Sequence, residues 1–424
     1  MKSETGWRQQ EIEREDGSLV EEICRLEILQ RAALEEEIDD ASLYGVIDRV
    51  IGEMAKIRYL PLAARGPLRR RLFDGFRRLD ILQELLEDDE ITEIMVNGHE
   101  NIFVERQGQV YRWDRGFDNR QKLEDVIQQI VARVNRVVNE SSPTVDARLP
   151  DGSRVNVVLP PVSLSGPILT IRKFASTPIT MEQLVEWGSI SQEAALVLKT
   201  LVQARYNIFI CGGTGSGKTT FLNALSQFIP SHERVITIED SAELQLMDQP
   251  DLVRLETRTG HGEVEVSIRQ LIRCSLRMNP DRIIVGEVRG EEALDMLQAM
   301  NTGHDGSLST GHANSPGDML MRLATMVLMA AELPLQAIDS QIASAIDILI
   351  HLGKLRDGSR KVLSVMEVGT VEMQKIILRP IFEFEETGMD EEGRIRGIWH
   401  QHLSRLTDPH KLALAGLQDP LRSL

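Results

Sequence analysis

The first part of the chain carries a helical repeat of apolar residues. Between residues 18 and 34, Leu, Ile and Ala recur every three or four positions, separated by Glu and Arg. This spacing is typical of an amphipathic helix. A second repeat runs from Leu43 to Ile57. Because proline and glycine interrupt helices, we expect Pro61 and the Gly66-Pro67 pair to end helical structure. We therefore predict a small helical bundle over residues 1–70, either a structural unit or a docking module for a partner.

After residue 82 the pattern changes to short alternating apolar runs, separated by turn residues such as Asn97-Gly98. Such alternation is typical of strands, and strands combined with a single helix indicate an α+β domain. We place this domain at residues 75–174 and a linker, which contains Pro178, at residues 175–182. The expected elements are strands at 91–98, at 101–113, within ARLPDGSRVNVVLPP and within PILTIRKF, and a helix at 123–138.

The strongest chemical signal lies between a short apolar strand, residues 207–211, and a helix that begins near Thr220. The intervening GGTGSGKT fits the pattern G-x-x-x-x-G-K-[ST]. Its glycines let backbone N–H groups surround phosphate oxygens, and the N-terminus of the helix adds partial positive charge. Lys218 balances the charge of the β- and γ-phosphates, and the Thr219 hydroxyl binds Mg²⁺. The alternative, an accidental glycine-rich turn, does not explain the strand–loop–helix context. We predict nucleotide binding by Gly213, Thr214, Gly215, Ser216, Gly217, Lys218, Thr219 and Thr220.

A second strand, within residues 234–246, ends in carboxylates. Glu239 and Asp240 close the strand, and Glu243 follows one helical turn later. Residues at the carboxyl ends of parallel strands face the ligand crevice of an open sheet. We therefore predict that Glu239, with Thr219, positions Mg²⁺ or water and that the other two carboxylates lie at the nucleotide. The alternative is an acidic N-terminus of a helix, where carboxylates are also favourable.

A third buried run, residues 282–285, is followed by Gly286-Glu287. An ordinary P-loop ATPase has an aspartate here that holds Mg²⁺ through water. The glutamate in this chain leads us to predict that Glu287 is the general base for the attacking water. The alternative is a structural salt bridge to Arg289.

Two histidines, His304 and His312, lie on either side of a predicted strand at residues 306–310. They lack the nearby cysteine pair or i,i+4 partner that a zinc site needs, so zinc binding is the weaker interpretation. A buried polar group of the core is the structural alternative. We predict that His304 belongs to the nucleotide site and that His312 senses the terminal phosphate.

Composition narrows the classes of function. A length of 424 residues suits two or three domains. The three cysteines are far apart and exclude a disulfide framework. Arg322 interrupts the best apolar stretch, residues 319–331, and the N-terminus has no apolar signal-peptide core, so we expect a cytoplasmic chain. The basic run RRRLFDGFRRL, residues 69–79, is a linker, a solvated helix face or a contact for lipid headgroups or an acidic partner.

The motifs occur in a characteristic order: GGTGSGKTT, TIEDSAEL, RMNPDRIIVGEVRGEEALDMLQAM and TGHDGSLSTGHANS. They resemble the Walker A loop, acidic box, Walker B segment and histidine box of the secretion ATPases that power type II and type IV secretion and type IV pili. The resemblance extends upstream through DARLPDGSRVNVVLPP and TIRKF and covers roughly residues 82–352. STGHANS and the missing tetracysteine zinc module make the chain most similar to the CpaF-type ATPases of tight-adherence (Flp) pili. Conjugation-type ATPases, which share HANS, are the closest rivals.

The resemblance implies an α/β fold with a RecA-like P-loop domain at residues 183–424 and a smaller, PAS-like α+β domain before it. It implies a homo-hexamer that hydrolyses ATP with Mg²⁺ to drive Flp pilus assembly. The sequence leaves open whether such a motor extends the pilus, retracts it or does both. Such a motor lies at the cytoplasmic side of the inner membrane, contacts platform proteins there and meets pilin only indirectly. In this family, arginines of the N-terminal domain reach the γ-phosphate; the matching positions are Arg148, Arg154 and Arg172, with Arg254 and Arg258 as a second candidate pair. The alternative for each is a strand arginine paired to surface carboxylates.

Two other classes of function fit less well. A nucleic-acid translocase needs a basic tract with stacking aromatics, whereas this chain has a net charge of −17 and 4% aromatic residues. We therefore expect no direct contact with nucleic acid. A non-hydrolysing scaffold would have no need of Lys218, Thr219, Glu239 and Glu287. The segment after Gly353 carries no motif, and we expect it to cap the C-terminal domain.

Overall fold

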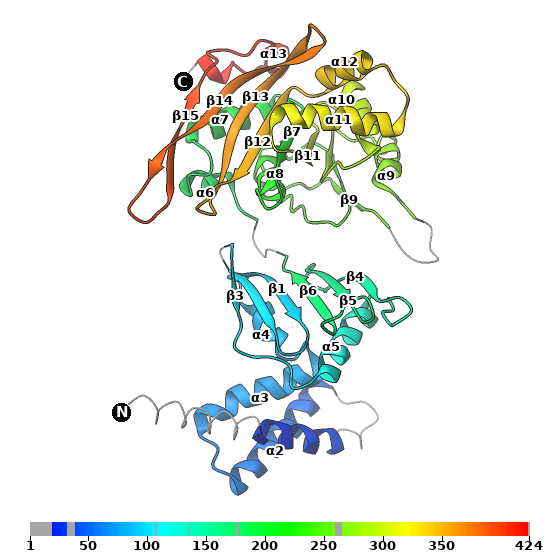
Figure 1. Ribbon diagram of the computed structural model, residues 1–424, viewed down its shortest axis with the longest axis vertical. Coiled ribbons are helices and arrows are strands. Elements are labelled where there is room, and N and C mark those ends of the chain that lie inside the picture. The colour runs from blue at the N-terminus through cyan, green and yellow to red at the C-terminus, as the bar shows by residue number, and fades with distance from the viewer. Residues whose placement is uncertain are drawn as a thin grey trace. The chain divides into compact units, whose positions relative to one another are not determined.

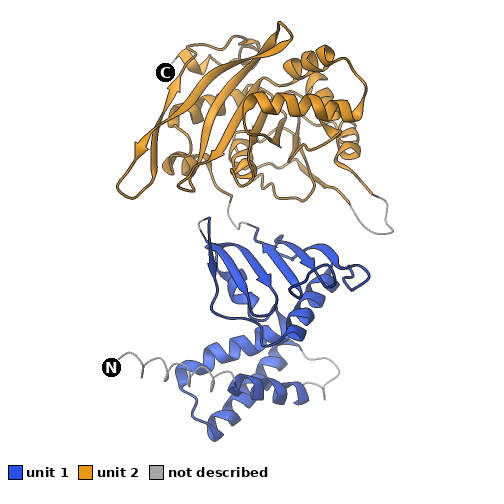
Figure 2. Ribbon diagram, in the orientation of Figure 1, with its two compact units in different colours: residues 1–176 blue, residues 177–424 orange. Residues whose placement is uncertain are grey.

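The computed structural model describes residues 19–31, 39–106, 108–134, 136–174, 178–258 and 265–422. The chain divides into two compact units, residues 1–176 and residues 177–424 (Figure 2). The end of the first apolar repeat, near residue 34, and the start of the expected linker, residues 175–177, lie outside the described residues.

The first unit begins with helices that share a core of their own. Residues 19–31 are helical, followed by α2 (Asp40–Ile57) and α3 (Leu62–Arg77). Pro61 is the N-cap of α3, but Gly66 and Pro67 lie inside the helix, so the expectation that this pair ends helical structure is wrong. The apolar residues that follow the pair, Leu68, Leu72 and Phe73, are buried in the helical core. Their burial offsets the roughly 3 kcal/mol that an interior proline costs a helix.

The basic run forms one part of α3 and is compensated by carboxylates of the same unit. Arg69 pairs with Asp48 at 2.5 Å, and Arg71 pairs with Glu21 at 2.8 Å. Arg70 and Arg78 both pair with Glu87. The run is therefore a helix face and not a linker.

A six-stranded antiparallel sheet follows, with the order β3-β2-β1-β6-β5-β4 (Figure 1). The expected strands and the expected helix are present. Apolar residues of α4 and α5, among them Leu85 and Ile127, share one core with strand residues such as Ile94 and Ile171. The elements are α4 (Leu82–Glu87), β1 (Ile91–Asn97), β2 (Ile102–Arg106), β3 (Gln109–Arg112), α5 (Arg120–Arg133), β4 (Thr144–Arg148), β5 (Arg154–Val158) and β6 (Ile168–Arg172).

The second unit is built on a nine-stranded sheet with the order β15-β14-β13-β12-β7-β11-β10-β8-β9. The strands from β12 to β9 are parallel to their neighbours, whereas β13, β14 and β15 extend the sheet in antiparallel fashion. The strands are β7 (Ile208–Gly212), β8 (Val235–Glu239), β9 (Leu252–Glu256), β10 (Arg282–Val285), β11 (Leu308–His312), β12 (Ile348–Lys354), β13 (Arg360–Glu372), β14 (Lys375–Met389) and β15 (Ile395–Gln401). The α/β class is confirmed, while the RecA-like and PAS-like assignments stay predictions.

Helices cover both faces of this sheet, and β7 serves both cores (Figure 1). Ile208 and Ile210 share one core with α7 and α8, while Phe209 and Cys211 share the other with α10 and α11. The strand is therefore held from both sides at the sheet centre. The helices are α6 (Met181–Glu186), α7 (Gln192–Gln203), α8 (Lys218–Ser226), α9 (Ile268–Ser275), α10 (Glu292–Asn301), α11 (Pro316–Ala330), α12 (Leu335–Ala345) and α13 (His410–Leu414), with a short 3₁₀ turn η1 (Pro420–Arg422).

The segment after Gly353 contributes the three antiparallel strands and then packs its end onto the core through Leu406, Leu412 and Leu421. Within the described residues, no single helix is long and apolar enough to cross a membrane. Together, α11 and α12 have the required length and composition, but the pair is bent by 118°.

Candidate nucleotide site

The P-loop connects the buried strand β7 to the N-terminus of α8. Gly215 and Gly217 adopt positive φ angles of 71° and 90°, which glycine reaches without strain. A Cβ at Gly212 would collide with the carbonyl oxygen of Leu352 and lie 2.6 Å from Ser216 Oγ. The loop therefore closes tightly against β12 and ends at a helix N-terminus, the arrangement that binds phosphate.

Lys218 is 7% exposed, and its ammonium group lies inside the loop. Nζ donates to the carbonyl oxygens of Gly212 at 3.2 Å and Gly213 at 3.0 Å, and it lies 3.3 Å from His312 Nδ1. Burial lowers the pKa of Lys218, and the negative charge of Glu287 opposes this shift. Three acceptors thus match the three protons of the ammonium group.

His312, the last residue of β11, joins the P-loop lysine to a carboxylate. Its Nε2 lies 2.9 Å from Glu287 Oε1. Burial lowers the pKa of His312, although Glu287 opposes the shift, so the neutral imidazole is favoured. Because an ammonium group can only donate, Nδ1 accepts from Lys218 and the ring proton resides on Nε2. Nε2 is close to Glu287 Oε1, but that buried oxygen has no hydrogen-bond partner among the described residues. The contacts form a chain Lys218–His312–Glu287 whose second step is a close approach and not a hydrogen bond.

Glu287 follows β10 directly and also accepts a hydrogen bond from Arg289 at 2.6 Å. The salt bridge that was the alternative to a catalytic role is therefore present. Burial raises the pKa of Glu287, but the hydrogen bond and the charge of Arg289 outweigh it and hold this pKa below its usual range. The carboxylate is ionised near neutral pH, as a general base must be.

Glu239, the last residue of β8, is 3% exposed. Its Oε2 accepts N–H bonds from Glu243 at 2.7 Å and Leu244 at 2.9 Å. Burial raises the pKa of Glu239 to about 7, despite these two donors. A Cβ at Gly286 would lie 2.9 Å from Glu239 Cγ, so the glycine before Glu287 leaves the space that Glu239 fills. The described segment between β8 and β9 holds no helix, so the carboxylate organises a loop and not a helix N-terminus.

Two of these residues, Glu287 and His312, line a cleft of about 430 Å³. Asp240 lies at its margin, 3.7 Å from the guanidinium of Arg289. Thr219 and Thr220 are half-buried in the first turn of α8. The cleft is lined by Thr214, Glu287, Val288, Arg289, His312 and Arg322.

The amino-acid sequence that forms this cleft matches one protein family over most of the chain. Residues 77–387 match the family described as Type II/IV secretion system protein. The chain belongs to this secretion family. Conjugal transfer protein TrbB of Rhizobium radiobacter is 33% identical over 303 residues, which cover 70% of this chain and 90% of that protein. Type IV secretion system protein VirB11 of Brucella suis is 34% identical over 319 residues, covering 68% of this chain and 88% of that protein.

Solved structures of the secretion family share the fold. The ATPase DotB of Legionella pneumophila superposes with a TM-score of 0.51 at 21% identity, covering 69% of this chain and 80% of that one. The pilus retraction motor PilT with bound ADP also gives a TM-score of 0.51, at 19% identity, covering 71% of this chain and 82% of that one.

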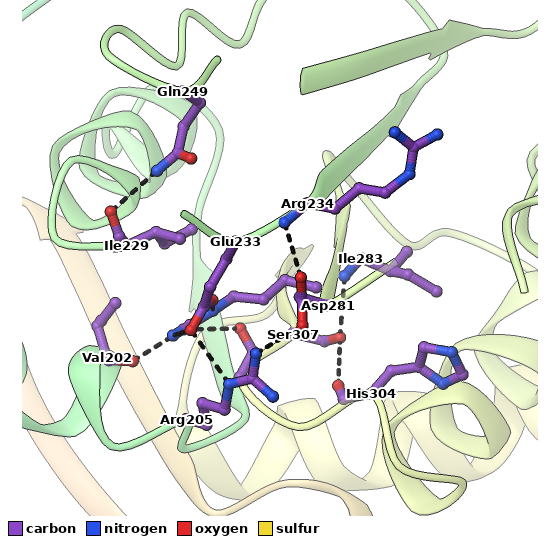
Figure 3. Close-up of polar contacts among 12 residues, drawn as sticks. Val202, Arg205, Ile229, Glu233, Arg234, Gln249, Asp281, Ile283, His304 and Ser307 are labelled. Carbon is purple, nitrogen blue, oxygen red and sulfur yellow. Dashed lines mark hydrogen bonds and ion pairs between the residues drawn. The ribbon is translucent and has the colours of Figure 1, made fainter. Parts of the chain in front are cut away.

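His304 lies at the opposite end of the parallel strands from the P-loop. It precedes β11, which runs parallel to β7, so it lies at the amino ends of these strands, whereas the P-loop follows their carboxyl ends. Its carbonyl oxygen accepts from Ser307 Oγ at 2.7 Å, and its ring Nδ1 lies 3.3 Å from the carbonyl oxygen of Ala299 (Figure 3). The structure does not bring His304 to the P-loop, and the two histidines cannot share a zinc ion.

The three arginines expected from the secretion family belong to the first unit, where the sheet brings them together. Arg154 of β5 is in register with Arg148 of β4 on one side and with Arg172 of β6 on the other. Residues directly opposite one another on neighbouring strands project from the same face. The second candidate pair lies in the other unit, where Arg254 is an exposed residue of β9 and Arg258 pairs with Val266 by a β-bridge.

Sequence reasoning missed two arginines near the P-loop. Arg360, the first residue of β13, donates from Nε to the carbonyl oxygen of Gly215 at 2.8 Å. Arg322 lines the cleft from α11. Both lie more than a hundred residues from the P-loop, in segments without a recognised motif, so only the folded chain reveals them.

Proposed function

We propose that this chain hydrolyses ATP with Mg²⁺ at the cleft beside its P-loop. The observation that carries this proposal is the chain Lys218–His312–Glu287, which links the loop lysine to an ionised carboxylate. A structural turn rich in glycine would need no such connection to the carboxyl end of β10.

The residues present fit a nucleotide with its metal. Gly215 and Gly217 hold the loop in conformations with positive φ, and the buried Ser216 hydroxyl has no hydrogen-bond partner among the described residues. Thr219 would offer its hydroxyl to Mg²⁺, with Glu239 at the end of the neighbouring strand to position it or its water. When bound, Mg²⁺ neutralises charge on the phosphates.

Glu287 accepts the proton of the attacking water in this proposal. Arg289 donates to one oxygen of the carboxylate, and His312 Nε2 lies 2.9 Å from the other. To reach a phosphate, Lys218 exchanges the carbonyl oxygens of the loop and His312 Nδ1 for phosphate oxygens. His312 then loses its donor while it remains beside Glu287. This change gives a physical basis for the prediction that His312 senses the terminal phosphate.

We further propose a homo-hexameric ring in which Arg148, Arg154 and Arg172 stabilise charge on the transferred phosphoryl group. Their register across three neighbouring strands supports this, because it gathers three guanidinium groups on one face of the sheet. Arginine forks match phosphate geometry and are a recurrent part of phosphoryl transfer.

Mixing two variants of the full chain tests hydrolysis and site sharing together. Arg172→Ala and Glu287→Gln should each lose at least about 100-fold in ATPase rate, since each removes transition-state stabilisation. If sites are shared between subunits, the mixture recovers part of the activity and the wild-type rate per chain rises with concentration. Wild-type rates in both single variants would contradict hydrolysis at this cleft. Inactive variants whose mixture recovers nothing, with a monomeric mass, would contradict the shared arginines.

For the cellular process, we propose a motor for Flp pilus assembly that acts on membrane platform proteins from the cytoplasmic side of the inner membrane and on pilin only indirectly. The support is the STGHANS segment and its resemblance to the CpaF-type ATPases. Conjugation-type secretion is the second candidate, because relatives over most of the chain are named conjugal transfer and type IV secretion proteins. A strain that lacks the chain separates the two: loss of surface pili supports the first, and loss of DNA or protein transfer with pili retained supports the second.

A further inference from the structure

Two guanidinium groups line the cleft, but only one of them is compensated. Arg289 pairs with Glu287 at 2.6 Å and with Asp240 at 3.7 Å. Arg322 forms no ion pair with a carboxylate among the residues that the structure describes, although it borders the same space. Even Asp318, one turn earlier on the same helix and at the spacing of a helical ion pair, does not pair with it. The positive charge of Arg322 is therefore available to an anion in the cleft.

The helix that carries Arg322 is fixed relative to His312. Ser315 caps α11 by accepting the N–H of Asp318 at 3.1 Å, three residues after His312 ends β11. Met319 is fully buried, and its terminal methyl group lies 3.0 Å from the position that a Cβ at Gly311 would take. Arg322 follows Met319 by one turn and is exposed. A helix anchored at its N-terminus thus presents a solvent-accessible arginine to the cleft, which Thr214 of the P-loop also lines.

The charge around the cleft favours an anion. Lys218, Arg289 and Arg322 contribute three cations at or beside the cleft, against the carboxylates of Glu287 in its lining and Asp240 at its margin. The positive charge of Arg322 also acts on His312, where it opposes protonation of the imidazole. A phosphate oxygen beyond the reach of Lys218 would meet the guanidinium of Arg322, whose planar donors suit phosphate.

We infer that Arg322 contacts the terminal phosphate of a nucleotide bound to the same chain and so distinguishes a nucleoside triphosphate from a diphosphate. This inference rests on the proposed function, because it requires nucleotide at the P-loop. It assigns one phosphate contact to α11 within the chain, separate from the arginines of the first unit. Arg289 instead keeps Glu287 in place, since its charge is already paired.

Nucleotide binding to the full-length chain tests the inference. Arg322→Gln should weaken binding of a non-hydrolysable ATP analogue by about 10- to 100-fold, the loss expected when a charged hydrogen-bonding partner is removed. Binding of ADP should stay within about twofold, and Arg322→Lys should fall between Arg322→Gln and wild type. Arg405→Gln is the matched control, because Arg405 is an exposed arginine of the C-terminal segment for which the structure shows no ion pair among its described residues.

The outcomes separate the inference from the proposed function. Two results for Arg322→Gln would overturn the role of Arg322 and leave the P-loop site intact. In the first, the variant binds both nucleotides as wild type does. In the second, it loses binding of both nucleotides equally while its circular dichroism is unchanged. Wild-type chain and Arg405→Gln that bind neither nucleotide overturn the proposed function, and the inference with it. Selective loss of the triphosphate analogue supports both.

Discussion

Burial and neighbouring charges shift the pKa values of two glutamates of the same site in opposite directions. Burial raises the pKa of Glu239 to about 7, because two backbone N–H bonds and the charge of Arg254 do not outweigh the loss of solvent. Glu287 is also partly buried, but the hydrogen bond and the charge of Arg289 hold its pKa below the usual range. Near neutral pH one carboxyl group titrates while the other is ionised. A pair of carboxyl groups with separated pKa values is a frequent basis for acid–base chemistry.

The pKa of Glu239 makes stability depend on pH. In the unfolded chain this group ionises near 4.5, whereas in the folded chain it does so near 7. Between these values the unfolded state binds fewer protons, so stability falls as the pH rises through this window and is constant above it. Glu239→Gln removes this dependence. Relative to wild type, the variant should gain about 2 to 3 kcal/mol in unfolding free energy between pH 5 and pH 8.

Urea unfolding without nucleotide or Mg²⁺ at both pH values checks this prediction. Any cost of the amide itself is the same at pH 5 and pH 8, so only the difference between them counts. An equal effect of the substitution at the two pH values would show that Glu239 keeps an ordinary pKa.

Some site residues were predictable because their signals are local. Lys218, Thr219 and the loop glycines form one contiguous motif, and Glu287 and His312 follow buried runs at the carboxyl ends of strands. Arg322 and Arg360 have no local signal, because what brings them to the P-loop is the packing of α11 and β13. His304 was misplaced because it precedes the strand and so lies at its amino end, whereas the P-loop follows the carboxyl end of the parallel strand β7.

At the scale of an element, the P-loop offers a matched pair of glycines. A Cβ at Gly212 would collide with the backbone of β12, whereas a Cβ at Gly213 has nothing within 4 Å. Gly212→Ala should therefore cost about 2 kcal/mol or more of stability, as strained core substitutions do, and Gly213→Ala should change it by less than about 0.5 kcal/mol. Thermal unfolding of the nucleotide-free chains measures both, and similar melting temperatures for the two variants would contradict the tight closure.

The amino ends of four parallel strands are joined by a buried arginine. Arg282 is fully buried, pairs with Glu233 and donates to the carbonyl oxygens of Val202 and Gly306. Arg205 approaches the same carboxylate from the end of α7 (Figure 3). These contacts tie the start of β10 to the segments that precede β7, β8 and β11.

Removal of Arg282 leaves a buried carboxylate with only Arg205 to compensate it. Arg282→Met should therefore lower the unfolding free energy by about 3 kcal/mol, as expected when one partner of a buried ion pair is lost. The double variant with Glu233→Gln should recover much of that loss. Chemical unfolding of the two variants and of Glu233→Gln measures the coupling, and strictly additive effects would show that the pair is not energetically linked.

Strands were predicted better than helix ends or loops. The run at residues 282–285 coincides with β10, and the run at residues 91–98 differs from β1 by one residue, because alternation and buried runs report packing directly. The prediction that the Gly66-Pro67 pair ends a helix was wrong, because the burial of the apolar residues that follow outweighs the low helix propensity of glycine and proline. The loop after Glu239 was unexpected because its order comes from a buried carboxylate that accepts two backbone N–H bonds.

At the scale of the whole molecule, the proposed machinery is divided between two units (Figure 2). The P-loop cleft lies within residues 177–424, which have two cores of their own, whereas Arg148, Arg154 and Arg172 lie in the first unit. A fragment of residues 178–424 should bind ADP as the full chain does but hydrolyse ATP no faster than full-length Arg172→Ala. Calorimetric binding and a steady-state ATPase assay check this, with circular dichroism to establish folding. Wild-type hydrolysis by the fragment would place the whole active site in the second unit.

The alternation of β7 side chains between two cores restricts which parts of the second unit can move. Ile208 and Ile210 are committed to one face, and Phe209 and Cys211 to the other. A slip of one residue along the strand would exchange these two sets and disrupt both cores at once. The sheet therefore cannot shift in register without the loss of both cores. In the proposed motor, displacement has to be carried by the loops at the carboxyl ends of the strands and by the helices that follow them.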